Sequence, residues 1–510
     1  MRKNVFDSAL SDHTPQSKPL PGKEHRMKSN PAGGYGFDEG AAGIVRRFVV
    51  LGIDNGTFYT SEHALARKTV DAIRSYANED TDGFADLLTY ARGVAMRQRD
   101  PLAAYAVGLD AVRSNPDKAA KLYEIFNDMI RTGGDMLVFM GYTRALGRGV
   151  GRGMRKAISR WYNRRNPQDT EFQIAKYRKR GGFAHEDVVR LAHPRPRSDY
   201  LSRVFRYITG HGPPTPLFEN IEAAKKVSTM SALEEIIKRG KLTWEMIPTD
   251  PWHKRPEFWD FMIPRLPPLA FVRHLHRFTD RCISGDHYCL RAKAIDRISR
   301  LNRGDARVHP GRVFNAYLEL VKRRKLDSAM ATELEEAFFR GFTDMERAHS
   351  SVAVALDMSG SMRWENRTHM AGALGVLLAK KFIGAHTYYF DTRAVTPDEA
   401  GVSPRELAFG RAGSPLGGGT AVSRVIERIE ADGVAADAIV IVTDEQSWYG
   451  RHPVAAFDDY KRRINRNAKL VVLSLAADGI SLTDPERSDQ MTVAGWTPDA
   501  ADIVARFIEE

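Results

Sequence analysis

The chain has 510 residues, enough for about two to four domains, and a formal net charge of +12 from 76 lysines and arginines against 64 acidic residues. Its two cysteines, Cys282 and Cys289, are too few for a disulfide framework or a zinc site. Because the amino terminus lacks an apolar secretory core and no run approaches the roughly 18 apolar residues that span a bilayer, we expect a soluble, cytoplasmic protein with no membrane partner.

The charge is divided unevenly along the chain. Residues 351–510 hold 17 lysines and arginines against 22 acidic residues, a net of −5. Residues 1–350 hold 59 against 42, a net of +17. A basic segment of this size favours a polyanionic partner, above all a nucleic acid.

The first forty residues are rich in Pro, Gly, Ser and Lys, which predicts an extended or flexible arm. A helical pattern follows it from about Ser61, where a capping residue precedes an apolar stripe. The pattern predicts further helices over 83–98, 101–114, 118–131, 135–147, 153–165, 170–180, 199–208, 218–239, 264–279, 286–301, 311–323 and 328–347. Many short helices with no strand between them indicate stacked pairs of the HEAT kind. Because no fixed period is visible, an irregular helical bundle stays open as the alternative.

The densest positive charge lies inside this helical region. Residues 144–206 contain 17 lysines and arginines and five acidic residues. Solvated helix faces usually mix both signs, and here acids are scarce, which favours nucleic-acid binding over an ordinary exposed surface. The candidate contacts that we take from the bases alone are Arg148, Arg152, Arg155 and Lys156.

From residue 351 the pattern changes to apolar strands alternating with helices. Strands are predicted over 351–356, 386–390, 438–443 and 469–475, and helices over 367–383, 421–431, 455–466 and 498–508. This alternation is typical of a doubly wound α/β domain with a parallel sheet.

Three pieces of this α/β region supply oxygen ligands. Asp357, Ser359 and Ser361 follow the first strand, Thr420 follows Gly417-Gly418-Gly419, and Asp444 follows the strand over 438–443. Two carboxylates and three hydroxyls form the hard ligand set that Mg²⁺ or Mn²⁺ prefers, at the strand ends where doubly wound sheets bind ligands. The set matches the metal-ion-dependent adhesion site of a von Willebrand A domain. The alternative is that Asp357 and the serines only cap a helix.

Several further strings resemble the Ro autoantigen family. They occur in one order along most of the chain, at 30–35, 47–52, 56–59, 151–158, 161–162, 176–178, 185–194, 243–249 and 262–264. Together with the adhesion-site motif, these strings identify the chain as similar to the bacterial Ro-like proteins. Family members combine a helical TROVE module with a von Willebrand A domain.

The resemblance implies a multidomain protein with a flexible arm over 1–29, a TROVE module of HEAT-like repeats over 30–348 that forms a ring, and a von Willebrand A domain over 349–510. It implies an RNA-binding scaffold, not an enzyme. Such a scaffold binds Y-like noncoding RNA on its basic outer surface and the single-stranded ends of misfolded RNAs in the ring. It acts in RNA quality control or decay with polynucleotide phosphorylase, reached through the RNA, and no DNA partner is expected. The family's RNA-contacting region maps onto Lys176, Arg180, His185, Arg190 and His193.

Two other functions remain open on the sequence. The first is a metal-dependent adhesion adaptor whose basic helical module binds an acidic protein. The second is a metal-dependent nuclease, which is disfavoured because no Glu and His set with recognisable spacing accompanies Asp357 and Asp444.

Overall fold

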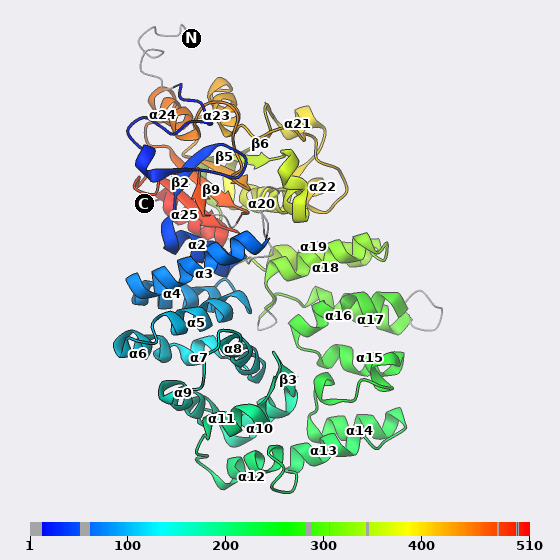
Figure 1. The fold of residues 1–510 in the computed structure, drawn as a ribbon. Helices are drawn as coiled ribbons and strands as arrows, with labels where there is room; N and C mark the ends of the chain where they lie inside the picture. The colour runs from blue at the N-terminus through cyan, green and yellow to red at the C-terminus, as the bar shows by residue number, and fades with distance from the viewer. Residues whose placement is uncertain are drawn as a thin grey trace. The chain divides into compact units, whose positions relative to one another are not determined.

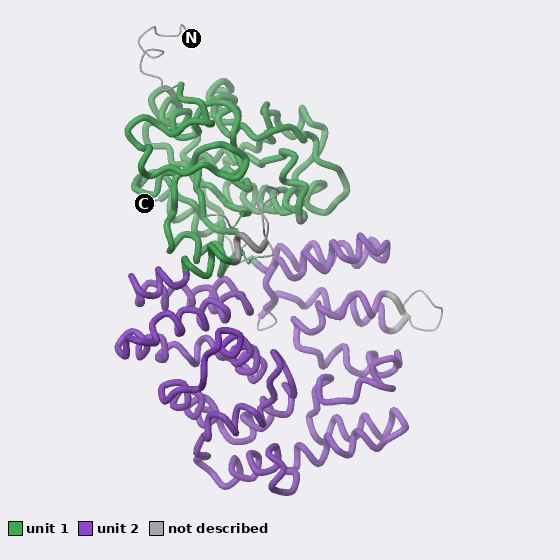
Figure 2. Tube along the Cα trace, viewed as in Figure 1, with its two compact units in different colours: residues 1–72, 342–510 green, residues 73–341 purple. Residues whose placement is uncertain are grey.

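The computed structural model describes residues 13–51, 62–281, 288–304, 307–342, 346–476, 479–495, 497 and 499–509. The chain forms two compact units, coloured separately in Figure 2: residues 1–72 together with 342–510, and residues 73–341. Cys282 and the motif over 56–59 lie outside the described residues.

The first unit is built on a six-stranded sheet in the order β11-β9-β8-β5-β6-β7 (Figure 1). Five strands are parallel, and the sixth, β7 (Ala394–Val395), runs antiparallel to β6. The parallel strands are β5 (Ala348–Asp357), β6 (Phe382–Phe390), β8 (Ala438–Thr443), β9 (Lys469–Ser474) and β11 (Gln490–Ala494). Because the chain leaves the central β5 first to one side and then to the other, the sheet is doubly wound, as expected.

Helices cover both faces of this sheet, which is why its strands read as continuous apolar runs. On one face α23 (Val422–Ala431) and α24 (Pro453–Arg463) bury side chains against Ala355 and Ile441. The other face carries α20 (Arg367–Lys381), where Gly375 lies against Leu356. All six residues of β8 are buried.

The predicted strands and helices of this unit are confirmed to within a few residues. The strand β11 was missed because it is short and mixes polar with apolar residues. Also missed were the 3₁₀ segment η5 (Gly360–Asn366) and the two short helices α21 (Pro397–Ala400) and α22 (Pro404–Ala408), whereas α25 (Ala500–Glu509) lies where a helix was predicted over 498–508.

The N-terminal segment belongs to the same unit. Strands β1 (Met27–Ser29), β2 (Tyr35–Asp38) and β10 (Ile480–Ser481) form a second, antiparallel sheet, with η1 (Glu24–Arg26) before it. The helix α2 (Gly40–Leu51) follows and packs on β11. Lys23 donates to Asp484 at 2.8 Å, and Arg26 pairs with the same carboxylate.

The structure therefore differs from the sequence-based expectation for the start of the chain. Residues 13–29, expected in a flexible arm, are bonded to the α/β unit, where Gln16 N–H donates to Gly450 O at 2.9 Å. The boundaries placed at residues 30 and 349 follow the motifs, whereas packing assigns residues 30–51 to the α/β unit. Pro- and Gly-rich composition signals a lack of regular secondary structure and carries no information about docking.

Among the residues described for the second unit, the one element of strand structure is a hairpin of β3 (Lys179–Arg180) and β4 (Phe183–Ala184), and the other regular elements are helices. Its helices, beginning in α3, are α3 (Glu62–Glu79), α4 (Thr81–Gly93), α5 (Asp100–Ala111), α6 (Pro116–Glu124), α7 (Phe126–Met129), α8 (Gly133–Ala145), α9 (Arg152–Asn163), α10 (Pro167–Lys176), α11 (His185–Ala192), α12 (Asp199–Ile208), α13 (Pro216–Ala224), α14 (Met230–Gly240), α15 (Pro256–Met262), α16 (Pro268–Arg281), α17 (Tyr288–Ser299), α18 (Pro310–Lys322) and α19 (Ser328–Arg340). Short 3₁₀ turns lie between some of them: η2 (Trp244–Met246), η3 (Trp252–Lys254) and η4 (Ile263–Arg265).

Neighbouring helices stack as pairs. The helix α16 contacts α17 and α18, and α19 contacts both α17 and α18, so each pair packs on the next as in HEAT-like repeats. Many helices begin at a polar cap, such as Asn166, whose Oδ1 accepts the N–H of Asp169 at 2.8 Å. Arg273 of α16 donates to Gln98 Oε1 at 3.1 Å, so the helical unit curves back toward its own first helices.

Sequence reasoning placed most of these helices and misjudged some of their breaks. The segment over 218–239 is divided into α13 and α14, because Thr229 caps a new helix. The helix predicted over 170–180 ends at Lys176, and α11 was not predicted. None of the described helices combines the length and apolar character needed to cross a membrane.

Candidate metal and RNA sites

The predicted metal ligands lie on three segments: the loops that follow β5 and β8, and the glycine loop that precedes α23. Gly360 N–H donates to Gly418 O at 2.9 Å, which ties the loop after β5 to the glycine loop. The amides of Trp448 and Tyr449 donate to Thr420 O at 3.2 and 3.1 Å, which ties the loop after β8 to the same place. The fold thus brings together three segments that lie far apart in the sequence.

The loop after β5 is fixed by its own side chains. Asp357 is fully buried, and its Oδ1 accepts the N–H of Ser359 at 2.8 Å. Its Oδ2 accepts the hydroxyl of Thr443 at 2.6 Å. The hydroxyls of Ser359 and Ser361 lie 3.3 Å apart, so all three predicted groups of this loop are turned inward together.

The glycine loop that carries Thr420 depends on a carboxylate that sequence reasoning missed. Asp391 follows β6 and is buried, and its Oδ2 accepts the N–H groups of Gly418 at 2.9 Å and Gly417 at 3.3 Å. A side chain at Gly419 would meet the ring of Trp448 at 2.8 Å, so the glycine is needed there. An acidic residue directly after a predicted strand was the available signal for Asp391.

The second predicted carboxylate, Asp444, is also fully buried. Its Oδ2 lies 3.3 Å from Nη1 of the buried Arg367, and its Oδ1 accepts the N–H of Gln446 at 3.2 Å. Burial, followed by the negative charge of Asp444, raises the pKa of Asp357 to about 7. The charge of Asp444 therefore disfavours the charged form of Asp357.

This arrangement fits a small divalent cation. A cation removes the repulsion that raises the pKa of Asp357, and hydroxyls and carboxylates are the donors that Mg²⁺ and Mn²⁺ take. Within the described part of the chain, no group of three or more His, Cys, Asp or Glu side chains is placed to hold a metal. A cation here would depend on the mixed set of Asp357, Ser359, Ser361, Thr420 and Asp444.

Large aromatic side chains are exposed on the same loops. Trp448 and Tyr449, four and five residues after Asp444, are 40% and 46% exposed, and their rings pack edge to face at 5.8 Å. Trp364, in the segment after Ser361, is 49% exposed. Exposed aromatic groups of this kind mark surfaces that contact other molecules.

In the helical unit, α9 presents the clearest basic face. Its Met154, Ile158 and Trp161 are buried, while Arg152 and Arg155 are exposed. Lys156 and Arg160 are exposed as well, and α9 contains no acidic residue. The helix spacing thus separates a core stripe from a positive stripe.

The other predicted RNA contacts differ in access. Arg180 in β3, Arg190 in α11 and His193, which ends α11 with φ of 48°, are exposed. Arg148 is half-buried and donates to the hydroxyl of Tyr123 at 3.2 Å. The side chain of Lys176 is only 13% exposed.

His185 lies in the core rather than on the surface. It is 2% exposed, and its Nδ1 lies 2.7 Å from the hydroxyl of Tyr162. Its ring stacks near that of Trp161, and burial lowers its pKa to about 3, so the imidazole is neutral. The predicted contact between His185 and RNA is therefore contradicted by its burial, and the residue supports the packing beneath α9 and α11.

A second group of bases is assembled by the fold alone. Burial lowers the pKa of the Arg273 guanidinium, and the charges of Arg99 and Arg180 lower it further. Arg312 is affected in the same way by burial and by Arg97 and Arg273. We call these five residues the arginine cluster. Sequence reasoning found only Arg180, because the other four come from three separate segments with modest local charge.

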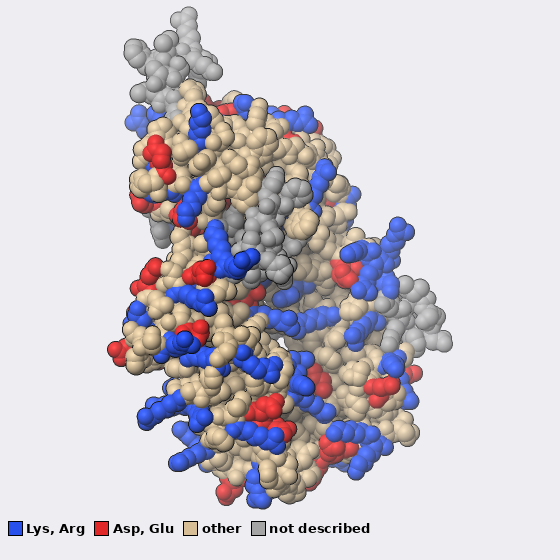
Figure 3. Space-filling view, viewed as in Figure 1, with Lys and Arg blue, Asp and Glu red and all other residues tan. Residues whose placement is uncertain are grey.

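The arginine cluster and the face of α9 add basic side chains to the surface of the helical unit. Figure 3 shows lysine and arginine side chains spread over the visible face of the helical unit, with fewer acidic ones among them. Like charges held this close favour an anionic ligand that bridges them.

Comparison with known proteins gives consistent results for both units. The model of the TROVE domain matches residues 28–236, and that of the Ro60 vWA domain matches residues 351–508. A Deinococcus radiodurans protein named RNA-binding protein RO60 is 26% identical, over 99% of each chain. A Caenorhabditis elegans protein of the same name is 22% identical, over 95% of this chain and 90% of its own.

A solved structure agrees in fold. The crystal structure of the Deinococcus radiodurans RO (RSR) protein has a TM-score of 0.66 at 24% identity, and the match covers 92% of this chain and 99% of that one. Both relatives are named RNA-binding proteins, in agreement with the RNA binding expected from the sequence. With a TROVE domain and a Ro60-type von Willebrand A domain in this order, the chain belongs to the Ro family.

Proposed function

We propose that the protein is an RNA-binding scaffold whose helical unit holds the RNA. The observation that carries the proposal is the exposed basic face of α9, which has four positive side chains and no acid. Such a face neutralises phosphates in sequence-independent contacts. The names of the relatives support the same function.

In finer detail, the proposed ligands are a Y-like noncoding RNA and the single-stranded ends of misfolded RNAs. The face of α9 suits a structured RNA, because it is broad and exposed. The arginine cluster suits a single strand of RNA. Its guanidinium groups come from several elements and lie close enough for their charges to affect one another. By resemblance to bacterial family members, the complex acts in RNA quality control with polynucleotide phosphorylase, held through the RNA.

The metal site is proposed to bind Mg²⁺ or Mn²⁺. The buried Asp357 and Asp444 supply negative charge, and Ser359, Ser361 and Thr420 supply neutral oxygens, so that an acidic group of a partner can complete the coordination shell. The proposed role of the metal site is to bind a ligand through the cation.

The test of RNA binding compares two triple variants with equal charge loss. Arg152→Ala, Arg155→Ala and Lys156→Ala together are expected to weaken binding of a structured small RNA by at least about tenfold, since each phosphate contact contributes. The control carries Lys225→Ala and Lys226→Ala, just after α13, and Lys238→Ala, on α14, and is expected to bind as the wild type does. Gel-shift titrations measure the affinity of both variants. If both lose RNA affinity equally, or if neither loses any, α9 is not the RNA-binding surface.

A second candidate function is metal-dependent adhesion to an acidic protein segment. The exposed Trp448, Tyr449 and Trp364 favour it, because they place apolar area on the segments that follow Asp444 and Ser361. The two functions differ in what ultraviolet crosslinking recovers from cells. A defined small RNA supports the scaffold, whereas recovery of protein alone, lost in Trp448→Ala, supports the adaptor.

A further inference from the structure

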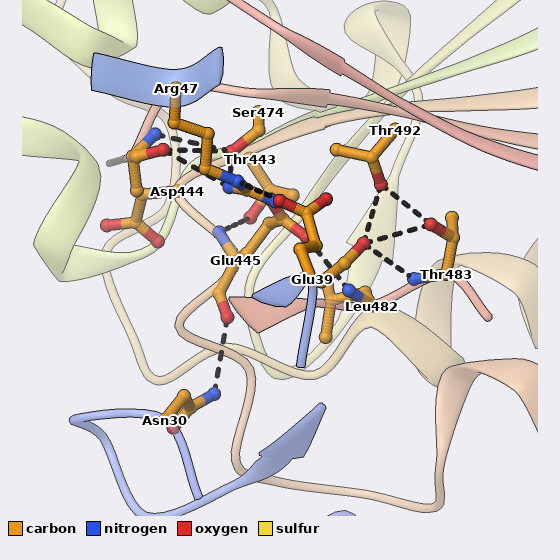
Figure 4. Close-up of polar contacts among 12 residues, drawn as sticks. Asn30, Glu39, Arg47, Thr443, Asp444, Glu445, Ser474, Leu482, Thr483 and Thr492 are labelled. Carbon is orange, nitrogen blue, oxygen red and sulfur yellow. Dashed lines mark hydrogen bonds and ion pairs between the residues drawn. The ribbon is translucent and has the colours of Figure 1, made fainter. Parts of the chain in front are cut away.

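A buried ion pair joins the N-terminal segment to the loop of a predicted metal ligand. Figure 4 shows Arg47 of α2 among Glu39, Glu445 and Ser474, with Asp444 beside them. Arg47 Nε donates to Glu39 Oε2 at 2.7 Å, and Nη1 donates to Glu445 Oε1 at 2.6 Å and Ser474 Oγ at 2.5 Å. Arg47 and Glu445 are each 1% exposed, so solvent does not screen their pairing.

The backbone after Asp444 needs external support. Glu445 has φ of +59°, a left-handed conformation that a residue with a side chain keeps only when its surroundings hold it. Besides Arg47, its carboxylate accepts the N–H of Leu482 at 2.8 Å, and its carbonyl accepts a hydrogen bond from Asn30 Nδ2 at 3.2 Å. Two of these three supports come from the N-terminal segment.

Asn30 also supports the loop further along. Its Nδ2 donates to Ser447 O at 2.8 Å, while its Oδ1 accepts the N–H of Gly34 at 2.9 Å. The backbones approach so closely that a side chain at Gly34 would lie 1.9 Å from Ser447 O. Ser447 Oγ in turn donates to Thr420 O at 3.4 Å, so this contact reaches a second ligand loop.

The same turn is bonded to the other carboxylate. Glu445 N–H donates to Thr443 Oγ1 at 3.0 Å, and that hydroxyl donates to Asp357 Oδ2 at 2.6 Å. The backbone conformation of Glu445 therefore influences the position of Asp357, through Thr443, as well as that of its neighbour Asp444.

We propose that Arg47 and Asn30 are positioning residues of the metal site. The N-terminal segment holds the loop over 444–448 in the conformation that presents Asp444 and Thr420 to the cation. This inference rests on the proposed binding of Mg²⁺ or Mn²⁺. Residues that orient ligands from outside the coordination shell commonly change metal affinity by about tenfold to a hundredfold.

The test uses the full-length protein and Mn²⁺ as the probe. Calorimetry measures the Mn²⁺ dissociation constant, and hydrogen exchange in the metal-free protein measures the opening of residues 444–448. In Asn30→Ala and Arg47→Met, we expect dissociation constants raised by about ten- to a hundredfold and faster exchange in this loop. Arg26→Met is the control, since Arg26 bonds the same unit through Asp484 and Glu486 without touching the loop.

A merely structural role predicts another result. General destabilisation lowers the melting temperature with and without Mn²⁺ by similar amounts and leaves the dissociation constant of the folded protein unchanged. Folded variants that bind Mn²⁺ as the wild type does would overturn the positioning role. If Arg47→Met does not fold, Asn30→Ala decides, because it leaves no buried charge unpaired. A wild type that binds no Mn²⁺ overturns the metal site itself, and the positioning role with it.

Discussion

Two buried carboxylates, Asp357 and Asp444, are central to the metal site that we propose for the α/β unit. The hydroxyl of Thr443 and the amide of Ser359 hold the first, and Arg367 lies against the second. Burial and the nearby charge of Asp444 hinder ionisation of Asp357. A divalent cation resolves this conflict, which makes these residues the sharpest probes of metal binding.

Asp357→Ala is expected to abolish Mg²⁺ and Mn²⁺ binding and to leave RNA affinity unchanged, because the RNA surfaces proposed here belong to the helical unit. Calorimetry with both ions and a gel shift on the same preparation measure the two effects. Retained metal affinity would refute the adhesion site, and loss of RNA binding by the folded variant would refute the division of roles.

His185 predicts how acid affects the helical unit. Its pKa is lowered by burial to about 3 from an ordinary 6.5, so the unfolded chain takes up a proton that the folded protein refuses. The stability this histidine contributes is complete above pH 6.5 and is lost as pH falls from 6.5 toward 3, by up to about 1.4 kcal/mol per pH unit. In His185→Gln, urea titrations between pH 6.5 and 4.5 should show a shallower loss of stability with acid; the wild-type slope in that variant would contradict this account.

At the scale of elements, hydrophobic periodicity predicted the helices and strands whose buried positions recur at regular spacing. It gave no information about contacts between segments that lie far apart in the sequence. The strand β8 occurs where predicted, because its continuous apolar run is buried on both faces. The docking of α2 could not be predicted, because it depends on the pairing of Arg47 with Glu445. Nothing in the sequence around either residue indicates that the other is its partner. Asp357, Ser359, Ser361, Thr420 and Asp444 could be chosen by motif, whereas Asp391, Arg99, Arg273 and Arg312 acquire their neighbours only in the fold.

The arginine cluster and α9 are expected to bind different parts of an RNA. Arg99→Ala with Arg273→Ala should weaken binding of an unpaired oligonucleotide by about tenfold or more, because guanidinium groups supply both charge and stacking. Binding of a fully base-paired small RNA should change much less. Fluorescence anisotropy with both probes measures the difference, and equal losses for the two RNAs would show a single shared surface.

At the scale of the whole molecule, the charge is partitioned between a basic region and an acidic one. RNA binding should therefore depend steeply on salt. With roughly six phosphate contacts, affinity should fall on the order of a thousandfold between 50 and 200 mM salt, since each contact releases condensed counterions. Filter binding across this range gives the slope, and a nearly flat response would exclude the basic surfaces as the main determinant.

The N-terminal segment has a consequence for synthesis on the ribosome. Arg47 and Glu445 lie 398 residues apart in sequence, and β2 pairs with β10 across a similar span. The α/β unit therefore cannot be completed until nearly the whole chain has been translated, while the helical unit lies between and relies on local contacts. During translation the helices have the opportunity to fold first, and the early segment waits for its partner. A chain halted before β8 lacks both the proposed ligand Asp444 and the loop that the N-terminal segment supports.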